Sequence, residues 1–366
     1  MIDGPKTSKT SEADAGLISA SSDAAVAEFD EDRKSALQRL QHFLHGNPAM
    51  VPVIILIISV VAFRLVAGER FFSAFNLSLI IQQVTIIGFL ACAQTLIILT
   101  AGIDLSIAAI MVLASVVAGK FAVVLGVPPV IAIPLGFLVG TLSGLVNGAL
   151  VTKLRLPPFI VTLGTWNIFF ALVIWYSGSQ SIRSQDIDKI APSLKFFGER
   201  VTIDGPILQG AVFTYGSFLM VAVFLVLWYV LNNTAWGRHV YAVGDDKDAA
   251  ELSGINTDRL LLSVYGVAGF IAGIAAWVSI GRVGSVSPQS FYDANLDSIT
   301  AVVIGGTSLF GGRGSILGAL FGALIVGVFS SGLKIAGVDV IWQRFAIGCL
   351  IIMAVGIDQW LRRVSS

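Results

Sequence analysis

Three carboxylates stand within four positions of this chain, at Asp245, Asp246 and Asp248. Such a group could hold Mg²⁺ for a diphosphate substrate, as in intramembrane enzymes that transfer prenyl groups. An enzyme of that kind needs a second acidic cluster facing the first, and the sequence contains none. The three histidines are not spaced as metal ligands. We therefore predict no metal site and look for another role for this polar segment.

The segment has the features of a short capped helix between two long hydrophobic runs. Asp245 or Asp246 can cap its start, and Gly254 suits the left-handed residue that ends a helix. We expect Leu252 and Ile255 to face back toward the rest of the chain. A membrane chain rarely keeps so polar a helix unless a partner outside the lipid contacts it. The residues that we assign to this contact are Gly244, Asp245, Asp246, Lys247, Ala249, Ala250, Glu251 and Gly254.

The chain shows no energy source of its own. It has no Gly-x-x-x-x-Gly-Lys-Ser/Thr sequence, the loop that binds the phosphates of ATP. Its one Gly-Lys pair, Gly119-Lys120, is followed by Phe121 and lacks the upstream glycine. It also lacks a nucleophile with a paired base. We therefore predict a transport protein, not an enzyme. It must either act passively or take its drive from a separate subunit, which would bring ATP and Mg²⁺; no cofactor is expected in this chain.

The composition is that of an integral membrane protein. Of 366 residues, 55% are hydrophobic and 13% are charged, whereas about a quarter of the residues of soluble domains are charged. Basic and acidic residues balance at 23 each, so net charge indicates neither a nucleic acid nor an acidic partner. The two cysteines lie in apolar runs and do not suggest a disulfide framework.

Hydrophobic stretches near the length that a bilayer requires predict an all-α membrane protein with about ten transmembrane helices. The predicted spans are 49–68, 76–99, 105–125, 129–151, 159–177, 211–231, 261–280, 297–311, 315–333 and 340–360. Basic residues follow the fourth, sixth and tenth spans, all on the side of the N-terminal tail, so both termini are expected in the cytoplasm. The loop 178–210 then faces outward.

The first 46 residues form a separate region. They contain eight acidic and five basic residues and no apolar core of a signal peptide. We predict a disordered acidic cytoplasmic tail with a short surface helix after about residue 28, followed by a transmembrane permease domain over 47–366.

Two series of glycines recur every four residues, on one helix face each. Small residues allow the close backbone contact by which helices associate in lipid. These faces are therefore expected to be buried, either within one chain or between two copies. The residues are Gly136, Gly140, Gly144 and Gly148 in the first series, and Gly314, Gly318 and Gly322 in the second.

Two segments predict broken or re-entrant helices, at 101–106 and at the glycine-rich stretch 305–314. Asp104 in the first segment is costly in lipid, by about 2.5–3.5 kcal/mol on insertion scales, so it needs a partner or water. It could cap the following helix or line a transport path. The second-to-fifth and seventh-to-tenth spans have opposite orientations and could form an inverted repeat.

Uncharged polar side chains within the spans could hydrogen-bond a neutral hydroxylated solute. They could equally hold helices together. The candidates for a translocation path are Gln94, Asp104, Ser106, Asn147, Thr165 and Asn167.

Four strings in this order resemble the permease subunits of bacterial ABC importers for monosaccharides of the ribose, xylose and fructose group. They are TAGIDLSIAAIMVLAS, KLRLPPFIVTLGT, WGRHVYAVGDDKDAAELSGI and LDSITAVVIGGTSLFGGRGSILGALFGALIV, and the resemblance covers roughly residues 50–362. It implies a homodimeric permease in the inner membrane, cytoplasmic ATPase subunits and a periplasmic sugar-binding protein. It also implies that the capped helix is the coupling helix that contacts the ATPase.

Two other functions remain open from the sequence. Permeases for branched-chain amino acids share strings like GIDLS and Gly-Gly-x-Gly. A secondary carrier would take up its substrate without an ATPase. The sequence does not identify which sugar would be carried.

Overall fold

The computed structural model describes residues 50–203, 205 and 210–365. The predicted acidic tail and its surface helix lie outside these residues. The first half of the described chain contains α2 (Met50–Ala67), α3 (Ala74–Leu99), α4 (Ile107–Gly119), η1 (Lys120–Val124), α5 (Pro129–Lys153), α6 (Pro158–Ser177), α7 (Ser184–Ile190) and η2 (Pro192–Gly198). The second half contains β1 (Arg200–Ile203), β2 (Ala211–Thr214), α8 (Tyr215–Asn233), α9 (Ala235–Asp245), α10 (Lys247–Leu252), α11 (Thr257–Val283), α12 (Ala294–Ile304), α13 (Ile316–Ile335) and α14 (Val340–Ser365).

The predicted all-α membrane fold is confirmed. Among the described residues, eight helical segments are long and apolar enough to cross a membrane: α2, α3, α4 with η1, α5, α6, α8, α11 and α13. The eighth predicted span, 297–311, is shorter than expected, because α12 has only 11 residues and rises about 16 Å. The tenth predicted span is helical, as α14.

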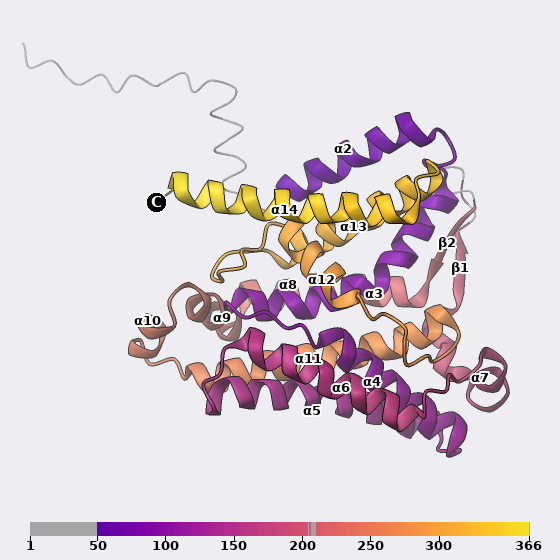
Figure 1. Ribbon diagram of the computed structural model, residues 1–366, viewed down its shortest axis with the longest axis horizontal. Coiled ribbons are helices and arrows are strands. Elements are labelled where there is room, and N and C mark those ends of the chain that lie inside the picture. Colours follow the sequence, from indigo (N-terminus) through magenta and orange to yellow (C-terminus); the bar gives the residue numbers. More distant parts are fainter. Residues whose placement is uncertain (1–49, 204, 206–209, 366) are drawn as a thin grey trace, which may run out of the picture. The chain divides into compact units, whose positions relative to one another are not determined.

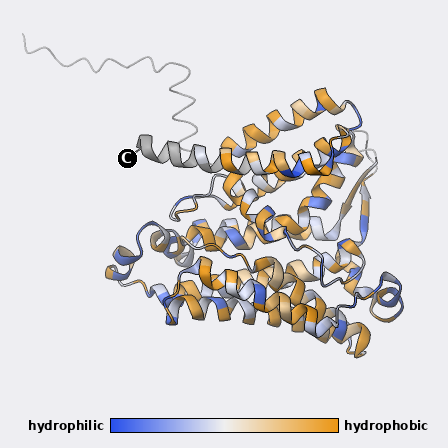
Figure 2. Cartoon of the chain, in the orientation of Figure 1, coloured by the Kyte–Doolittle hydropathy of each residue, from blue (hydrophilic) through white to orange (hydrophobic). Residues whose placement is uncertain are grey.

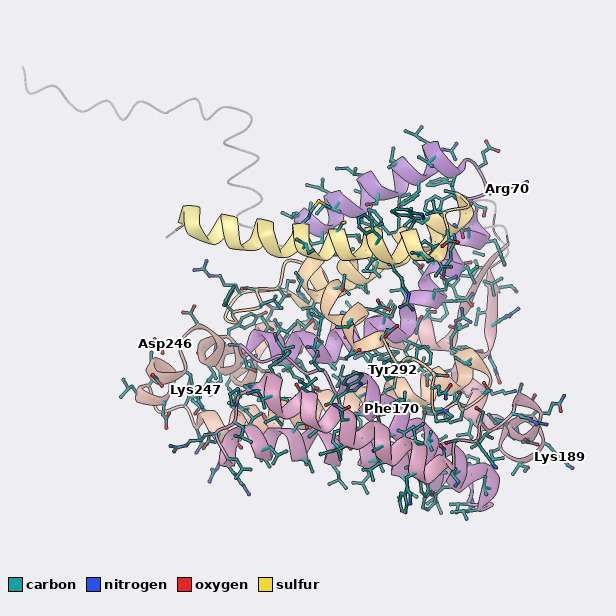
Figure 3. The ribbon with its side chains drawn as sticks, viewed as in Figure 1. Arg70, Phe170, Lys189, Asp246, Lys247 and Tyr292 are labelled. Carbon is teal, nitrogen blue, oxygen red and sulfur yellow. The ribbon has the colours of Figure 1, made fainter. Side chains whose placement is uncertain are left out.

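The polar elements lie at two opposite ends of the bundle. Figure 1 shows α9 and α10 at one end, and α7 with the antiparallel pair β1–β2 at the other. Hydrophobic residues dominate the helices between them, and hydrophilic residues gather at the ends (Figure 2). The labelled side chains in Figure 3 follow this division, with Asp246 and Lys247 at the first end and Lys189 at the second. The two ends are therefore the parts suited to meet water and partners.

The first glycine series packs within the chain. A methyl group added to Gly140 would collide with the carbonyl oxygen of Gly269 and lie 3.0 Å from the Gly273 nitrogen, both on α11. One added to Gly144 would meet the carbonyl oxygen of Tyr265 on the same helix. Gly148 also faces α11, whereas Gly136 faces α4. The backbones of α5 and α11 are therefore in direct contact.

The second glycine series also packs within the chain. Gly318 and Gly322 of α13 face the backbone of α12, at Gly305 and Ala301 respectively, while Gly314 faces Thr307. Both predicted faces are thus buried inside one copy. A contact between subunits has to use other surfaces.

The pairs of packed helices repeat between the two halves. In the first half α4 packs on α5, and in the second half α12 packs on α13. Helix α11 packs on both members of the first pair, and α3 packs on both members of the second. This reciprocal pattern is what a two-fold relation between α3–α6 and α11–α14 produces. It supports the inverted repeat that span parity suggested.

Candidate functional site: the broken helices and the α9–α10 turn

The first broken helix is a non-helical segment between Leu99, where α3 ends, and Ile107, where α4 begins. Its backbone groups are bonded by side chains from surrounding helices. Gln94 pairs with the carbonyl and N–H of Asp104, both at 3.1 Å, once its amide is oriented to match them. Thr162 donates to the carbonyl of Ile103 at 2.9 Å. Backbone freed from a helix at membrane depth is stable only where protein receives it in this way.

Two further side chains hydrogen-bond to the non-helical segment before α4. Asn295 of α12 donates to the carbonyl of Leu105 at 3.0 Å, and Asn147 of α5 donates to the Ser106 hydroxyl at 2.7 Å. The segment is therefore fastened to α3, α5, α6 and α12 at once.

Asp104 acts locally. Its Oδ1 accepts hydrogen bonds from the Ser106 N–H and from the Ser106 hydroxyl, each at 2.6 Å. These bonds satisfy the N–H and hydroxyl of Ser106, the residue before α4, while the start of α4 itself has no side-chain cap. Asp104 is only 1% exposed, so its carboxylate does not line an open path in this conformation.

The predicted path residues divide into two groups. Gln94, Asp104, Ser106 and Asn147 form one buried cluster. Thr165 is buried but bonds within its own helix, at 3.4 Å to the Thr162 carbonyl. Asn167 lies on the exposed face of α6 and donates to the Leu163 carbonyl at 3.0 Å. A path role for these residues stays a prediction, and the buried cluster has a structural role in holding the break.

The predicted polar helix is shorter than the segment 244–254. Helix α9 continues through Asp245, and α10 begins after Asp246, whose carboxylate caps it by accepting from the Ala249 N–H at 2.9 Å. Gly254 follows with φ +86°, as predicted for the residue that ends a helix. Of the residues assigned to coupling, Asp245, Asp246, Lys247, Ala249, Glu251 and Gly254 are exposed, while Gly244 and Ala250 are buried.

The predicted orientation was wrong for two side chains of α10. Ala250, expected to approach a partner, is 4% exposed and packs inward, whereas Leu252, expected to face inward, is 92% exposed. Ile255 is half-buried, as expected. The orientation differs from the expected one because the turn at Asp246 starts a new helix. The side chains of α10 therefore do not continue the faces of α9. Leu252 is therefore the large apolar side chain that α10 presents outward.

The α9–α10 turn touches both broken helices. The Gly312 N–H donates to the Leu99 carbonyl, where α3 ends, at 3.0 Å. A methyl group on Gly244 would collide with that same carbonyl and lie 2.6 Å from the Gly312 nitrogen. One on Gly311 would lie 2.7 Å from the Ala101 nitrogen. The end of α3, the glycine turn before α13 and the end of α9 thus meet backbone to backbone.

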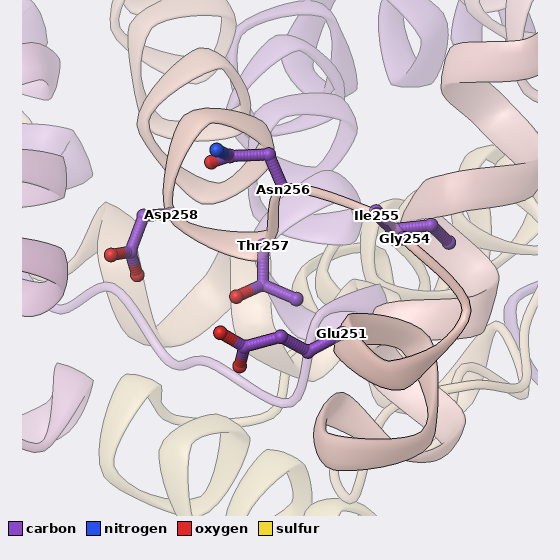
Figure 4. A pocket seen from close by; sticks show the side chains of 6 residues that line it. All are labelled: Glu251, Gly254, Ile255, Asn256, Thr257 and Asp258. Atoms are coloured by element: carbon purple, nitrogen blue, oxygen red, sulfur yellow. The ribbon is translucent and has the colours of Figure 1, made fainter.

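An acidic pocket lies beside α10. It has a volume of about 270 Å³ and is lined by Glu251, Gly254, Ile255, Asn256, Thr257 and Asp258. Figure 4 shows the Glu251 and Asp258 carboxylates at this opening. Neither carboxylate has a hydrogen bond or ion pair within the described part of the chain, so both are available to a basic side chain of a partner.

Comparison with known proteins identifies the family. A family model described as the permease component of branched-chain amino acid transport systems matches residues 76–355. The chain belongs to this permease family. It is 55% identical over 349 residues to the fructose import permease protein FrcC of Rhizobium meliloti, which covers 95% of this chain and 96% of that protein. No solved structure matches the chain.

Further relatives of this permease are also named for sugars. The ribose import permease protein RbsC of Bacillus subtilis is 36% identical over 308 residues, covering 84% of this chain and 90% of its own. The xylose transport system permease protein XylH of Escherichia coli is 29% identical over 365 residues, covering 86% and 93%. The resemblance to monosaccharide import permeases drawn from the four strings is confirmed. Together with the eight apolar helices, it makes the chain a multi-pass inner-membrane protein and a transporter component.

The structure of the permease also shows a polar group that the sequence reasoning missed. Asp297 lies in the first turn of α12 and is half-buried against α3, α13 and α14. The predicted span 297–311 begins at this residue, and no role was assigned to it. Its place in the string LDSITAVVI could have identified it, because it is the one charged residue of an otherwise uncharged and largely apolar string. Just before α12, the ring of Tyr292 meets that of Phe170 on α6 edge to face, with 5.1 Å between the ring centroids (Figure 3).

Proposed function

We propose that the chain is the membrane-spanning permease of an ABC importer, and that it moves a monosaccharide of the fructose, ribose or xylose class inward. The observation that carries this proposal is the 55% identity to a fructose import permease over 95% of the chain. A periplasmic binding protein would deliver the sugar, and a cytoplasmic ATPase would supply ATP and Mg²⁺. Basic residues flank α5, α6, α9 and α11 at the end of the bundle where α10 lies: Lys153, Arg155, Arg238 and Arg259. Basic residues mark the cytoplasmic side, so this end and both chain termini would be cytoplasmic.

The substrate is tested by reconstitution in vesicles with the ATPase and the binding protein. Labelled fructose, ribose, xylose and leucine are offered in competition. We expect ATP-dependent uptake of a sugar and none of leucine. Uptake of leucine without sugar would favour the amino-acid branch that the family description names. Uptake by the permease alone, driven by a proton or sodium gradient, would favour a secondary carrier.

We propose that α10 is the contact with the ATPase. Leu252 is a large apolar side chain exposed on a polar helix, so a partner that covered it would gain the free energy of burying its apolar surface. The carboxylates of Glu251 and Asp258 beside it suit basic side chains at the rim of such a contact. Movement of α10 would reach the ends of α3 and the turn before α13, because Gly244 contacts both backbones.

Leu252→Ala is expected to weaken binding of the ATPase about ten- to thirtyfold, the loss of roughly 1.4–2 kcal/mol when a packed apolar anchor is truncated. The measurement is the affinity of the purified permease in nanodiscs for the ATPase subunit. Leu154→Ala is the matched control, since Leu154 is another exposed leucine, in the connection between α5 and α6. Equal affinities for both variants and the wild type would contradict the assignment of α10.

We propose that two copies of the chain pack against each other as a homodimer. Neither glycine face is available for this contact, because both are buried within one chain. Native mass spectrometry of the permease in detergent would report two copies. A monomer that transports sugar after reconstitution would contradict the proposal.

A further inference from the structure

A cavity of about 200 Å³ lies between α3, α12, α13 and α14. This volume is below the ~300–1,000 Å³ typical of pockets for drug-sized ligands, so the cavity suits a smaller solute. Its apolar wall is formed by Val84, Ile87, Val326, Gly327 and Ile347, and its polar lining by Gln83, Asp297, Ser330 and Lys334.

The four polar groups of this cavity have no protein partner. Within the described residues, none of the four side chains takes part in a hydrogen bond or a salt bridge. Other hydroxyls in the spanning helices do bond: Thr85 and Thr95 donate to carbonyls one turn earlier, at 2.8 and 2.7 Å. In the buried cluster around Asp104 most groups bond to one another, although the Asn147 Oδ1 has no partner among the described residues. The cavity differs because all four of its polar side chains remain open to a ligand.

Asp297 is the costly member of this group. A carboxylate in a membrane-embedded helix is destabilising and marks a functional position unless it is paired. Asp293, one turn earlier, forms an ion pair with Arg344 at 3.2 Å. Asp297 has no hydrogen bond or ion pair among the described residues, although it is half-buried. Its place in the first turn of α12 favours a negative charge there, while both carboxylate oxygens stay free to accept hydrogen bonds from a ligand.

We propose that this cavity is a transient binding site for the transported sugar, a neutral polyhydroxylated molecule. A carboxylate accepts hydrogen bonds from two hydroxyls, an amide both donates and accepts, and an ammonium group donates to ring or hydroxyl oxygens. One negative and one positive group leave the lining without net charge, which suits an uncharged solute. The apolar wall would face the C–H groups of the ring. This assignment rests on the proposed function and places the sugar away from the buried Asp104 cluster.

The test uses the complete complex of permease, ATPase and binding protein in vesicles. Asp297→Asn keeps the shape of the side chain and removes its charge, and Gln83→Ala removes an amide that has no hydrogen bond to any described residue. We expect initial sugar uptake to fall at least tenfold in Asp297→Asn, and the ratio of fructose to ribose uptake to change at least threefold in Gln83→Ala. The matched control, Asp293→Asn, makes the same chemical change four residues earlier and should transport within twofold of the wild type.

ATP hydrolysis and assembly separate a binding role from a structural one. In both cavity variants, the assembled complex should form in normal yield and hydrolyse ATP within twofold of the wild-type rate. Normal sugar uptake and an unchanged sugar ratio in Gln83→Ala would overturn the proposed site, even if Asp297→Asn proved unstable. Wild-type vesicles that take up leucine and no sugar would instead overturn the proposed function itself.

Discussion

Replacing Gly140 by leucine is expected to prevent the permease from folding into a stable bundle. The first carbon of any side chain at this position would collide with the carbonyl oxygen of Gly269 and lie 3.0 Å from the nitrogen of Gly273. Backbone atoms cannot rotate away as a side chain can. The cost should therefore exceed about 3 kcal/mol, at the upper end of what overpacking causes. The measurements are the yield of monodisperse protein in detergent and the midpoint of thermal unfolding.

Gly164→Leu provides the control for this prediction. Gly164 is a helical glycine of α6, and an added side-chain carbon there meets no atom within 4 Å. The same change in volume and helix propensity should leave yield and unfolding midpoint close to those of the wild type. If both variants behaved alike, close contact between α5 and α11 would not be what stabilises the bundle.

Gln94→Leu is expected to release the first broken helix. The amide of Gln94 satisfies both the N–H and the carbonyl of the buried residue Asp104 in the non-helical segment. A leucine would leave both groups without a partner, at about 1–3 kcal/mol each, so about 2–6 kcal/mol in total. The segment adjoins the turn that holds Gly244 and Gly312, so transport should be lost as well. Thermal unfolding and the solvent accessibility of a cysteine introduced at Ile103 would measure the effect.

Asn167→Leu is the comparison for Gln94→Leu. Asn167 is an amide on the exposed face of α6, and its side chain donates only to the Leu163 carbonyl of its own helix. Its replacement should change stability by less than about 1 kcal/mol, the net value of one ordinary hydrogen bond. A loss as large as that of Gln94→Leu would show that burial at the break is not the decisive difference.

Local patterns in the sequence determined much of the architecture. Apolar stretches of the right length predict the eight long helices, since a bilayer requires about 20 such residues wherever they stand in the chain. Asp246 and Gly254 were recognised as helix ends because capping depends on residues only a few positions apart. The breaks at 101–106 and 305–314 followed from glycines and from Asp104 within apolar surroundings.

Contacts between distant segments could not be predicted in this way. The glycine series indicated tight packing, but only the tertiary structure shows that α11 and α12 are the partners and that both faces lie within one chain. The same holds for Leu252, because the direction of a six-residue helix depends on the turn that precedes it.

The cavity around Asp297 was hidden for the same reason, since Gln83 of α3 lies more than two hundred residues before the other polar groups of the lining, on α12 and α13. The sequence alone determined that the chain spans the membrane, roughly where its long helices lie, and which permease family it resembles. These depend on composition and on neighbouring residues. Only the tertiary structure decided which polar groups bond to one another and which stay open to a ligand, because hydrogen-bond partners at membrane depth are supplied by whichever helix packs alongside.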